Sequence, residues 1–432
     1  MASFARDTVS VGVSKLLIIG LGLAKSVIIA RWLGPEQNGL IAGLVIYPSL
    51  FMSLGSLGVR QATTYFVGSE QYPPEAIKSS VIQIWVLSTV LSVAASFFLV
   101  RHLSSAGDSL LLACLAVAPI PFALLNTYTS GIFLGKNRIK EFNRVNWLPH
   151  LFVFMATAVC VAILLQGVQG AMLAALAGPF CLTVLLSRKE NLFKFLSLVV
   201  DWRLLKNMLS LGSIYALALL VLNLNYKLDI VLLDRLATPY ELGIYSKGAH
   251  LMEYLWQVPA LFSVIVFARS AAAKDNDRFS LKVCQLLRLS LVAVALLAVG
   301  LAFVAPLVVH GLFGDEFGPS ATVLRIMLPG VVLLTSLKVV NMDLAGRGKP
   351  WVSIYAMGPA LIVNFALNIL LIPSHGANGA AFASTISYAV GGILSIALYS
   401  RAIKSEVLNI LGPSWTDLNV VYNQVRQLVR AS

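Results

Sequence analysis

Long apolar runs recur along this chain and restrict its possible folds more than any other feature. Eight or more of them reach about 18 residues, roughly the length that a helix needs to cross a hydrocarbon core about 30 Å thick. Of the 432 residues, 58% are hydrophobic and only 12% are charged, against about 25% charged in ordinary soluble domains. A water-soluble globular enzyme and a disordered chain are therefore excluded. Because the strand alternation of outer-membrane barrels is not seen, we expect an all-α, polytopic membrane protein.

About twelve transmembrane helices are expected, and the basic residues between them predict their orientation. Nearly all Lys and Arg residues outside the spans fall on one side, and only Arg31, Arg101 and Arg235 fall on the other. Cytoplasmic loops carry such an excess, so both termini are predicted to be cytoplasmic. The same bias explains most of the net charge of +13 without a nucleic-acid partner. The expected spans lie near 10–30, 38–59, 80–100, 109–134, 145–166, 171–187, 209–233, 242–268, 285–312, 321–343, 351–372 and 379–400.

An internal repeat relates the two halves of the chain. Residues that match in type and order recur at offsets of 204 to 211 positions, and six spans per half give both halves the same orientation. Transporters built from such repeats place their substrate between the repeats and alternate access by rocking. The matching segments are 31–39 with 235–243, 135–136 with 346–347, and 167–174 with 376–383.

The repeat predicts a division of the chain into two pseudo-symmetric six-helix bundles with two amphipathic segments. We expect an N-terminal bundle over 1–187, a cytoplasmic connector over 188–208, a C-terminal bundle over 209–402 and a cytoplasmic tail over 403–432. The connector and the tail combine apolar with basic residues, which is typical of helices that lie in the membrane interface.

Ten charged side chains fall within the expected spans, and cations outnumber acids among them. A cation facing lipid costs about 2.5–3.5 kcal/mol on insertion scales, so these groups must point into the bundle, pair, or reach the interface from a span end. Arg288 is expected to reach the interface. A cavity with excess cations favours an anionic substrate, and lysine is a point charge suited to phosphate. The ten are Lys15, Lys25, Lys227, Lys247, Arg288, Arg325, Lys338, Asp229, Glu253 and Asp343.

Polar residues accompany these charges on two spans, and on the second of them a polar stripe is formed by Lys247, His250, Glu253 and Gln257. Asn223 and Lys227 share a helix face, as do Asn225 and Asp229, because residues four apart are neighbours on a helix. We predict no catalytic residue, metal or cofactor. The predicted substrate-binding residues are Lys15, Lys25, Lys227, Lys338, Lys247, Arg325, Asn223 and Asn225, and the predicted ion-coupling residues are Asp229, Glu253 and Asp343.

Other functional patterns are weaker. The four cysteines, at positions 114, 160, 181 and 284, lie in apolar runs without C-x-x-C spacing, so neither a disulfide framework nor a metal site is supported. Asp275-Asn276-Asp277 fits the D-x-D pattern of glycosyltransferases, but it lies in a short basic connection without an accompanying domain. The candidate functions are a small-molecule exporter, a membrane glycosyltransferase and a non-transporting scaffold, the first of which agrees with the transporter that the repeat indicates.

The order and spacing of four motifs resemble the polysaccharide flippases of the Wzx type. They are Arg31 to Gly39, Asp229 followed by 243–246, the segment 312–317 leading to Pro329, and the segment 371–381. That family belongs to the multidrug/oligosaccharidyl-lipid/polysaccharide exporter superfamily. The resemblance implies two helical bundles that move a polyprenyl-diphosphate-linked oligosaccharide to the outer leaflet of a bacterial inner membrane.

The same resemblance implies partners. They are the lipid-linked oligosaccharide, membrane lipids, and a polysaccharide polymerase with its chain-length regulator. By position and chemistry, Lys15, Lys25, Lys227 and Lys338 would hold the diphosphate. The related peptidoglycan-precursor flippases usually have two further C-terminal spans, which makes that identity a weaker match.

Overall fold

The computed structural model describes residues 2–56, 58–195, 201–257, 276–347 and 351–412, together with residues 259, 266, 270 and 349. Within these residues the chain is helical and no strand is present. Eight of the described helical segments are long and apolar enough to cross a membrane. The expected all-α, polytopic membrane protein is thereby confirmed. The total of twelve spans stays a prediction, because most of 258–275 lies outside the described residues.

Two of the long helices each contain a sharp bend between two expected spans. Helix α1 (Ala2–Gly55) bends at Gly34, and α14 (Val352–Ile403) bends at Gly376, where φ is 69° and 52°. Positive φ is costly for residues with a Cβ and readily adopted by glycine. Each glycine therefore lets the chain reverse between one membrane crossing and the next without a long loop.

The chain forms two compact units. The first comprises residues 1–247, 309–319 and 372–377, and the second comprises 248–308, 320–371 and 378–432. Helix α9 (Trp202–Leu236) lies in the first unit, although the sequence repeat assigns it to the second half. The two units are defined by contacts within the structure, whereas the repeat is defined by the sequence, so the two divisions need not coincide. The division into two six-helix bundles stays a prediction.

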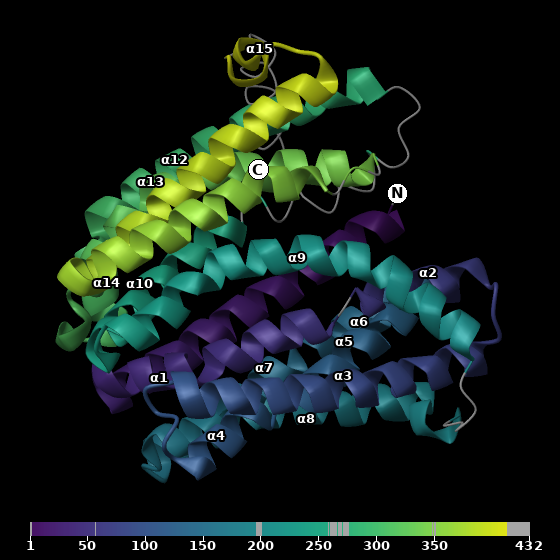
Figure 1. Ribbon diagram of the computed structural model, residues 1–432, viewed down its shortest axis with the longest axis horizontal. Coiled ribbons are helices and arrows are strands. Elements are labelled where there is room, and N and C mark those ends of the chain that lie inside the picture. Colours follow the sequence, from purple (N-terminus) through teal and green to yellow (C-terminus); the bar gives the residue numbers. More distant parts are fainter. Residues whose placement is uncertain are drawn as a thin grey trace. The chain divides into compact units, whose positions relative to one another are not determined.

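In the first unit, α1 runs alongside several other helices (Figure 1). It packs on α3, α7, α8 and α9, while α2 packs on α5 and α7 packs on α8. The other elements of the unit connect these packed helices. Besides α1 and α9, the unit contains α2 (Val59–Ser69), α3 (Pro74–Leu103), α4 (Leu110–Val117), α5 (Ile120–Gly135), α6 (Ile139–Asn146), α7 (Leu148–Thr157), a π-helical turn (Ala158–Ile163), α8 (Gly167–Glu190) and most of α10 (Pro239–Glu253).

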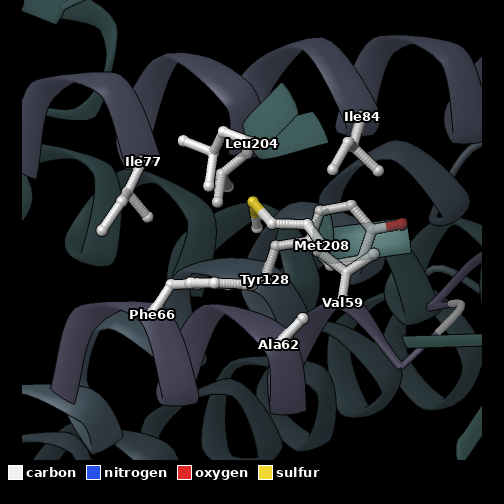
Figure 2. Close-up of a cluster of buried hydrophobic side chains, with 9 residues drawn as sticks. Val59, Ala62, Phe66, Ile77, Ile84, Tyr128, Leu204 and Met208 are labelled. Atoms are coloured by element: carbon white, nitrogen blue, oxygen red, sulfur yellow. The ribbon is translucent and has the colours of Figure 1, made fainter. Parts of the chain in front are cut away.

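A hydrophobic core joins α9 to α2, α3 and α5 (Figure 2). Leu204 and Met208 of α9 are fully buried, and Tyr128 of α5 donates a hydrogen bond to Ser88 Oγ at 2.9 Å. Helix α9 thus begins to pack at residue 204, inside the segment expected to be an interfacial connector. The other members of the core are Val59, Ala62, Phe66, Ile77, Val81 and Ile84.

The second unit is built around α12 (Asn276–Phe313), α13 (Ser320–Gly346) and α14, with the short α15 (Val407–Leu411) at one end. Polar side chains join α13 to α14: Ser336 donates to the Gly392 carbonyl at 3.0 Å, and Thr385 donates to the Ile326 carbonyl at 2.6 Å. Lipid is as apolar as the helices, so it provides no hydrophobic driving force for their association. Small and hydroxyl residues of this kind hold membrane helices together instead.

The packing of α9 predicts a stability difference between two leucines. Leu204→Ala opens a cavity in the core, and truncating a buried leucine costs about 2–5 kcal/mol. Leu281→Ala removes the same atoms from a side chain of α12 that is 66% exposed. Thermal unfolding of the purified protein should show a lower midpoint for Leu204→Ala only. Equal midpoints would contradict the packing of α9 in this core.

Candidate functional site

Two of the predicted substrate-binding lysines approach each other in the first unit. Lys247 of α10 is buried, and its Nζ donates to Ser26 Oγ of α1 at 3.0 Å. Lys25, the residue before Ser26, is half-buried and interacts electrostatically with Lys247. The ring of Phe313 lies 5.5 Å from the Lys247 ammonium. We call Lys25 and Lys247 the lysine pair.

The lysine pair carries positive charge without a carboxylate to balance it. Among the described residues, no Asp or Glu forms an ion pair with either lysine. His150 of α7 also interacts electrostatically with Lys25. Two like charges at membrane depth repel each other, so an anion between them would be stabilised by both.

Helix α9 carries the two predicted same-face residue pairs, and α9 packs on α1. Asn225 and Asp229 are fully buried, and Asp229 accepts a hydrogen bond from the Tyr245 hydroxyl of α10 at 2.9 Å. Asn223 and Lys227 are half-buried on the same helix, and Lys15 is half-buried on α1. All of these residues belong to the first unit.

The other predicted site residues belong to the second unit. The Lys338 ammonium lies over the ring of Trp256, 4.4 Å from its centre, an arrangement typical of a cation–π contact. Arg325 is exposed and donates to the Ala302 carbonyl at 2.8 Å, which joins α13 to α12. Glu253 is exposed, 3.7 Å from His250 Nδ1.

Arg288 was expected to reach the membrane interface. Its Nη1 donates to the Ile410 carbonyl at 3.0 Å and to the Asn409 carbonyl at 3.3 Å, near the end of α15, and its place at the interface stays a prediction. A cation at the C-terminus of a helix donates to carbonyls that have no partner within the helix, and it interacts favourably with the helix dipole.

Asp343, a predicted ion-coupling residue, has its carboxylate saturated by partners. It is fully buried, and it accepts from Ser270 Oγ at 2.5 Å, from the Tyr399 hydroxyl at 2.7 Å and from Arg347 Nη2 at 2.9 Å. These bonds join the carboxylate to three other side chains and fix its position. The arrangement favours a structural role for Asp343 over that of an ion carrier.

The repeated turns found in the sequence meet directly in the first unit. A Cβ placed on Gly39 would overlap the carbonyl oxygen of Pro239, and a Cβ placed on Gly243 would overlap that of Pro35. The contact is reciprocal, because Pro239 and Gly243 are the repeat counterparts of Pro35 and Gly39. We call these four residues the glycine crossing. Only glycine allows two backbones to approach this closely.

A second pair of repeat counterparts makes matching contacts beside the crossing. Glu241 accepts a hydrogen bond from the amide of Ala377 at 2.7 Å, next to the bend at Gly376. Gln37, its counterpart, lies beside Gly167, which also has a positive φ of 61°. The repeated motifs therefore position the turns that begin and end neighbouring spans.

Arg31 has a local explanation in the same region. Its Nε donates to the Leu312 carbonyl at 3.0 Å and its Nη2 to the Gly311 carbonyl at 2.5 Å, at the end of α12. A guanidinium at a helix C-terminus satisfies carbonyls that have no partner within the helix. Arg31 thus acts as a cap in addition to its value as a topology signal.

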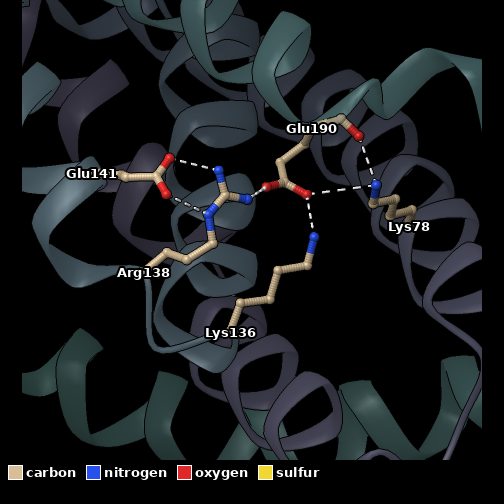
Figure 3. Close-up of polar contacts among 5 residues, drawn as sticks. All are labelled: Lys78, Lys136, Arg138, Glu141 and Glu190. Atoms are coloured by element: carbon tan, nitrogen blue, oxygen red, sulfur yellow. Dashed lines mark hydrogen bonds and ion pairs between the residues drawn. The ribbon is translucent and has the colours of Figure 1, made fainter.

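One charged cluster was missed by the sequence analysis. Glu190, at the end of α8, is bound by the three cations Lys78, Lys136 and Arg138, of which the last also binds Glu141 (Figure 3). We call these five residues the Glu190 cluster. In the sequence the three cations are recognisable only as topology signals, and Lys136 also as part of a repeated segment. The partners lie 52 to 112 positions apart, so no local spacing indicates the cluster.

Comparisons with known proteins agree with this architecture. The model of a family described as polysaccharide biosynthesis protein matches residues 28–322. A probable low-salt glycan biosynthesis flippase of Haloferax volcanii, Agl15, is 21% identical over 417 residues, covering 90% of this chain and 82% of the relative. A probable flippase of the same organism, AglR, is 25% identical over 191 residues, covering 41% of this chain and 38% of the relative.

Two solved structures have a similar fold. The lipid II flippase MurJ in an inward closed conformation gives a TM-score of 0.78 at 14% identity, covering 95% of this chain and 91% of that one. An inward-facing multidrug resistance transporter of the MATE family gives a TM-score of 0.72 at 14% identity, covering 89% and 94%. At these identities the likeness establishes the fold alone. The family match spans more than half of the chain, which therefore belongs to the polysaccharide biosynthesis protein family, as its resemblance to the Wzx-type flippases predicted.

Proposed function

We propose that the chain is a flippase that moves a polyprenyl-diphosphate-linked oligosaccharide from the cytoplasmic to the outer leaflet of the membrane. The observation that carries the proposal is the lysine pair, two cations inside a helical membrane protein without a carboxylate partner among the described residues. The relatives described as probable flippases, one of them of glycan biosynthesis, support the same function. The chain would act as a transporter and not as an enzyme.

The chemistry of the lysine pair suits a diphosphate. Keeping two ammonium groups near each other in the membrane costs free energy, and membrane proteins retain such groups chiefly for function. A diphosphate would cancel the repulsion and accept hydrogen bonds from both amines. Lys15 and Lys227, half-buried in the same unit, would add charge along its path, and Asn223 and Asn225 would bind sugar hydroxyls. Lys338 and Arg325 of the second unit are further proposed contacts for a negatively charged substrate.

Alternating access would involve the glycine crossing as the outer gate. The two repeated turns touch through their backbones there, so release to the outer leaflet requires them to separate. With the cytoplasmic termini predicted from the basic loops, these turns face outward. Rocking of the repeats about an axis near the lysine pair would then open one side at a time.

The membrane potential would favour export of the diphosphate. Moving each uncompensated negative charge outward is favoured by about 2.3 kcal/mol per 100 mV, inside negative. An ion could reset the carrier, with Asp229 or Glu253 as its site. Asp229 is the better candidate of the two, because it is buried and bound to Tyr245 of the neighbouring α10.

A small-molecule exporter of the same superfamily is the second candidate. The fold shared with a multidrug transporter favours it. The charge balance opposes it for cationic drugs, since cations outnumber acids within the spans. A bacterial inner membrane, a polysaccharide polymerase and a chain-length regulator belong to the flippase proposal as its location and partners.

The lysine pair predicts a specific loss of transport. Lys247→Gln should reduce polymer production at least tenfold at equal protein level, because a charge-assisted bond contributes about 1.5–3 kcal/mol. Lys282→Gln is the matched control, since that lysine is exposed on α12 and should tolerate the change. The measurement is surface polysaccharide in cells that lack the native gene. Normal polymer with Lys247→Gln would remove this lysine from the site.

The glycine crossing predicts a different effect. Gly39→Ala should impair closure of the outer side and abolish transport, because the added Cβ overlaps the Pro239 carbonyl. Gly22→Ala on the same helix meets open space and should leave transport intact. In a background without the four native cysteines, Ser26→Cys reports access to the lysine pair. Gly39→Ala should increase its labelling by an impermeant thiol reagent added outside; unchanged labelling would contradict the gate.

A further inference from the structure

The Glu190 cluster holds more positive than negative charge. Lys136 Nζ lies 2.6 Å from Glu190 Oε2, and Arg138 Nη1 lies 2.5 Å from Oε1. Lys78 Nζ lies 3.5 Å from Oε2 and donates to the backbone carbonyl of Glu190 at 2.6 Å. The Glu190 side chain is only 1% exposed. One buried carboxylate is thus shared among three cations.

Glu141 forms an ion pair with Arg138. Its Oε2 lies 2.6 Å from Arg138 Nη2, and this hydrogen bonding raises the pKa of Arg138, although desolvation lowers it. Lys189 and Arg144 also act electrostatically on Glu141, so further cations surround the cluster. Among the described residues, Glu190 is the acid that pairs with Lys136, and it is shared with Lys78 and Arg138, so one more anion would be stabilised beside Lys136.

A cavity lies against these two lysines. Its volume is about 580 Å³, and it lies where α2 ends, α3 begins and α5 ends. One part of its wall is cationic and the rest is largely apolar, with Glu70 and Gln71 exposed at its edge. The lining residues are Val67, Glu70, Gln71, Tyr72, Pro73, Pro74, Ile77, Lys78, Ile132 and Lys136.

We propose that this cavity binds the phosphate of an anionic phospholipid from the cytoplasmic leaflet. The phosphate would contact Lys136 and Lys78, and the glycerol and first acyl carbons would contact Val67, Ile77 and Ile132. Basic pockets between membrane helices on the cytoplasmic side recognise acidic headgroups in this way. The volume falls in the range that holds a drug-sized ligand, about 300–1,000 Å³, which suits a headgroup and is too small for an oligosaccharide with its lipid.

The site is separate from the lysine pair and does not depend on the proposed function. A bound headgroup would join the turn between α2 and α3 to the ends of α5 and α8, because its phosphate would share the lysines that Glu190 already holds. Anionic lipid should therefore raise the stability of this end of the first unit.

The test measures binding of short-chain phosphatidylglycerol to the purified full-length protein by native mass spectrometry. The wild type should retain the lipid, and phosphatidylcholine of the same chain length should be retained weakly. Lys136→Gln should weaken phosphatidylglycerol binding about fivefold, the equivalent of about 1 kcal/mol for one lysine near a charged lipid. Lys136→Arg should retain binding. Lys282→Gln removes the same charge elsewhere and should leave binding unchanged.

Three results would overturn the proposal. The first is equal retention of phosphatidylcholine and phosphatidylglycerol, and the second is unchanged binding in Lys136→Gln. The third is displacement of phosphatidylglycerol by a short isoprenyl diphosphate at much lower concentration, which would assign the cavity to the transported lipid. If Lys136→Gln yields no folded protein, Tyr72→Trp provides the second variant, since a larger ring in the cavity wall should also weaken binding while every ion pair of Glu190 remains.

Discussion

The cost of placing charge in a membrane without a counter-charge divides the ionic groups of this protein into two kinds. Asp343 and Glu190 are buried, and each is surrounded by donors that satisfy both of its oxygens. Removing one partner from such a group is expensive, about 3–5 kcal/mol, so these clusters hold helices together. Lys247 has a serine hydroxyl and an aromatic ring instead. That incomplete satisfaction is what distinguishes a site for a charged ligand from a structural ion pair.

The internal repeat shows how the same requirement has been met twice with different residues. Lys136 and Arg347 are counterparts at an offset of 211, and each binds a buried acid. In the first half that acid is Glu190 on α8. Its counterpart at an offset of 209 is Tyr399, whose hydroxyl donates to Asp343 on α13. In both repeats the cation lies at the end of a span. The acid that it binds is on α8 in the first repeat and on α13 in the second.

The sequence predicted the features that depend on neighbouring residues or on simple counting. Apolar runs indicated the helices, and the echo of 31–39 in 235–243 indicated turns that prove to contact each other. The Glu190 cluster could not be predicted, because it joins residues 78, 136 and 190 from three helices. The contact of Arg288 with α15 could not be predicted for the same reason, since its acceptors lie more than 100 positions away.

The two ends of the first unit are stabilised by contacts of different kinds. Helix α8 begins at Gly167, beside Gln37, and ends in the Glu190 cluster, so the glycine crossing and this cluster lie at opposite ends of the helix. The crossing joins one repeat to the other through backbone atoms. All members of the Glu190 cluster lie within residues 78–190. Asp343 and its partners all lie within residues 270–399. Each cluster therefore joins helices within one repeat, whereas the crossing joins the two repeats and opposes their separation.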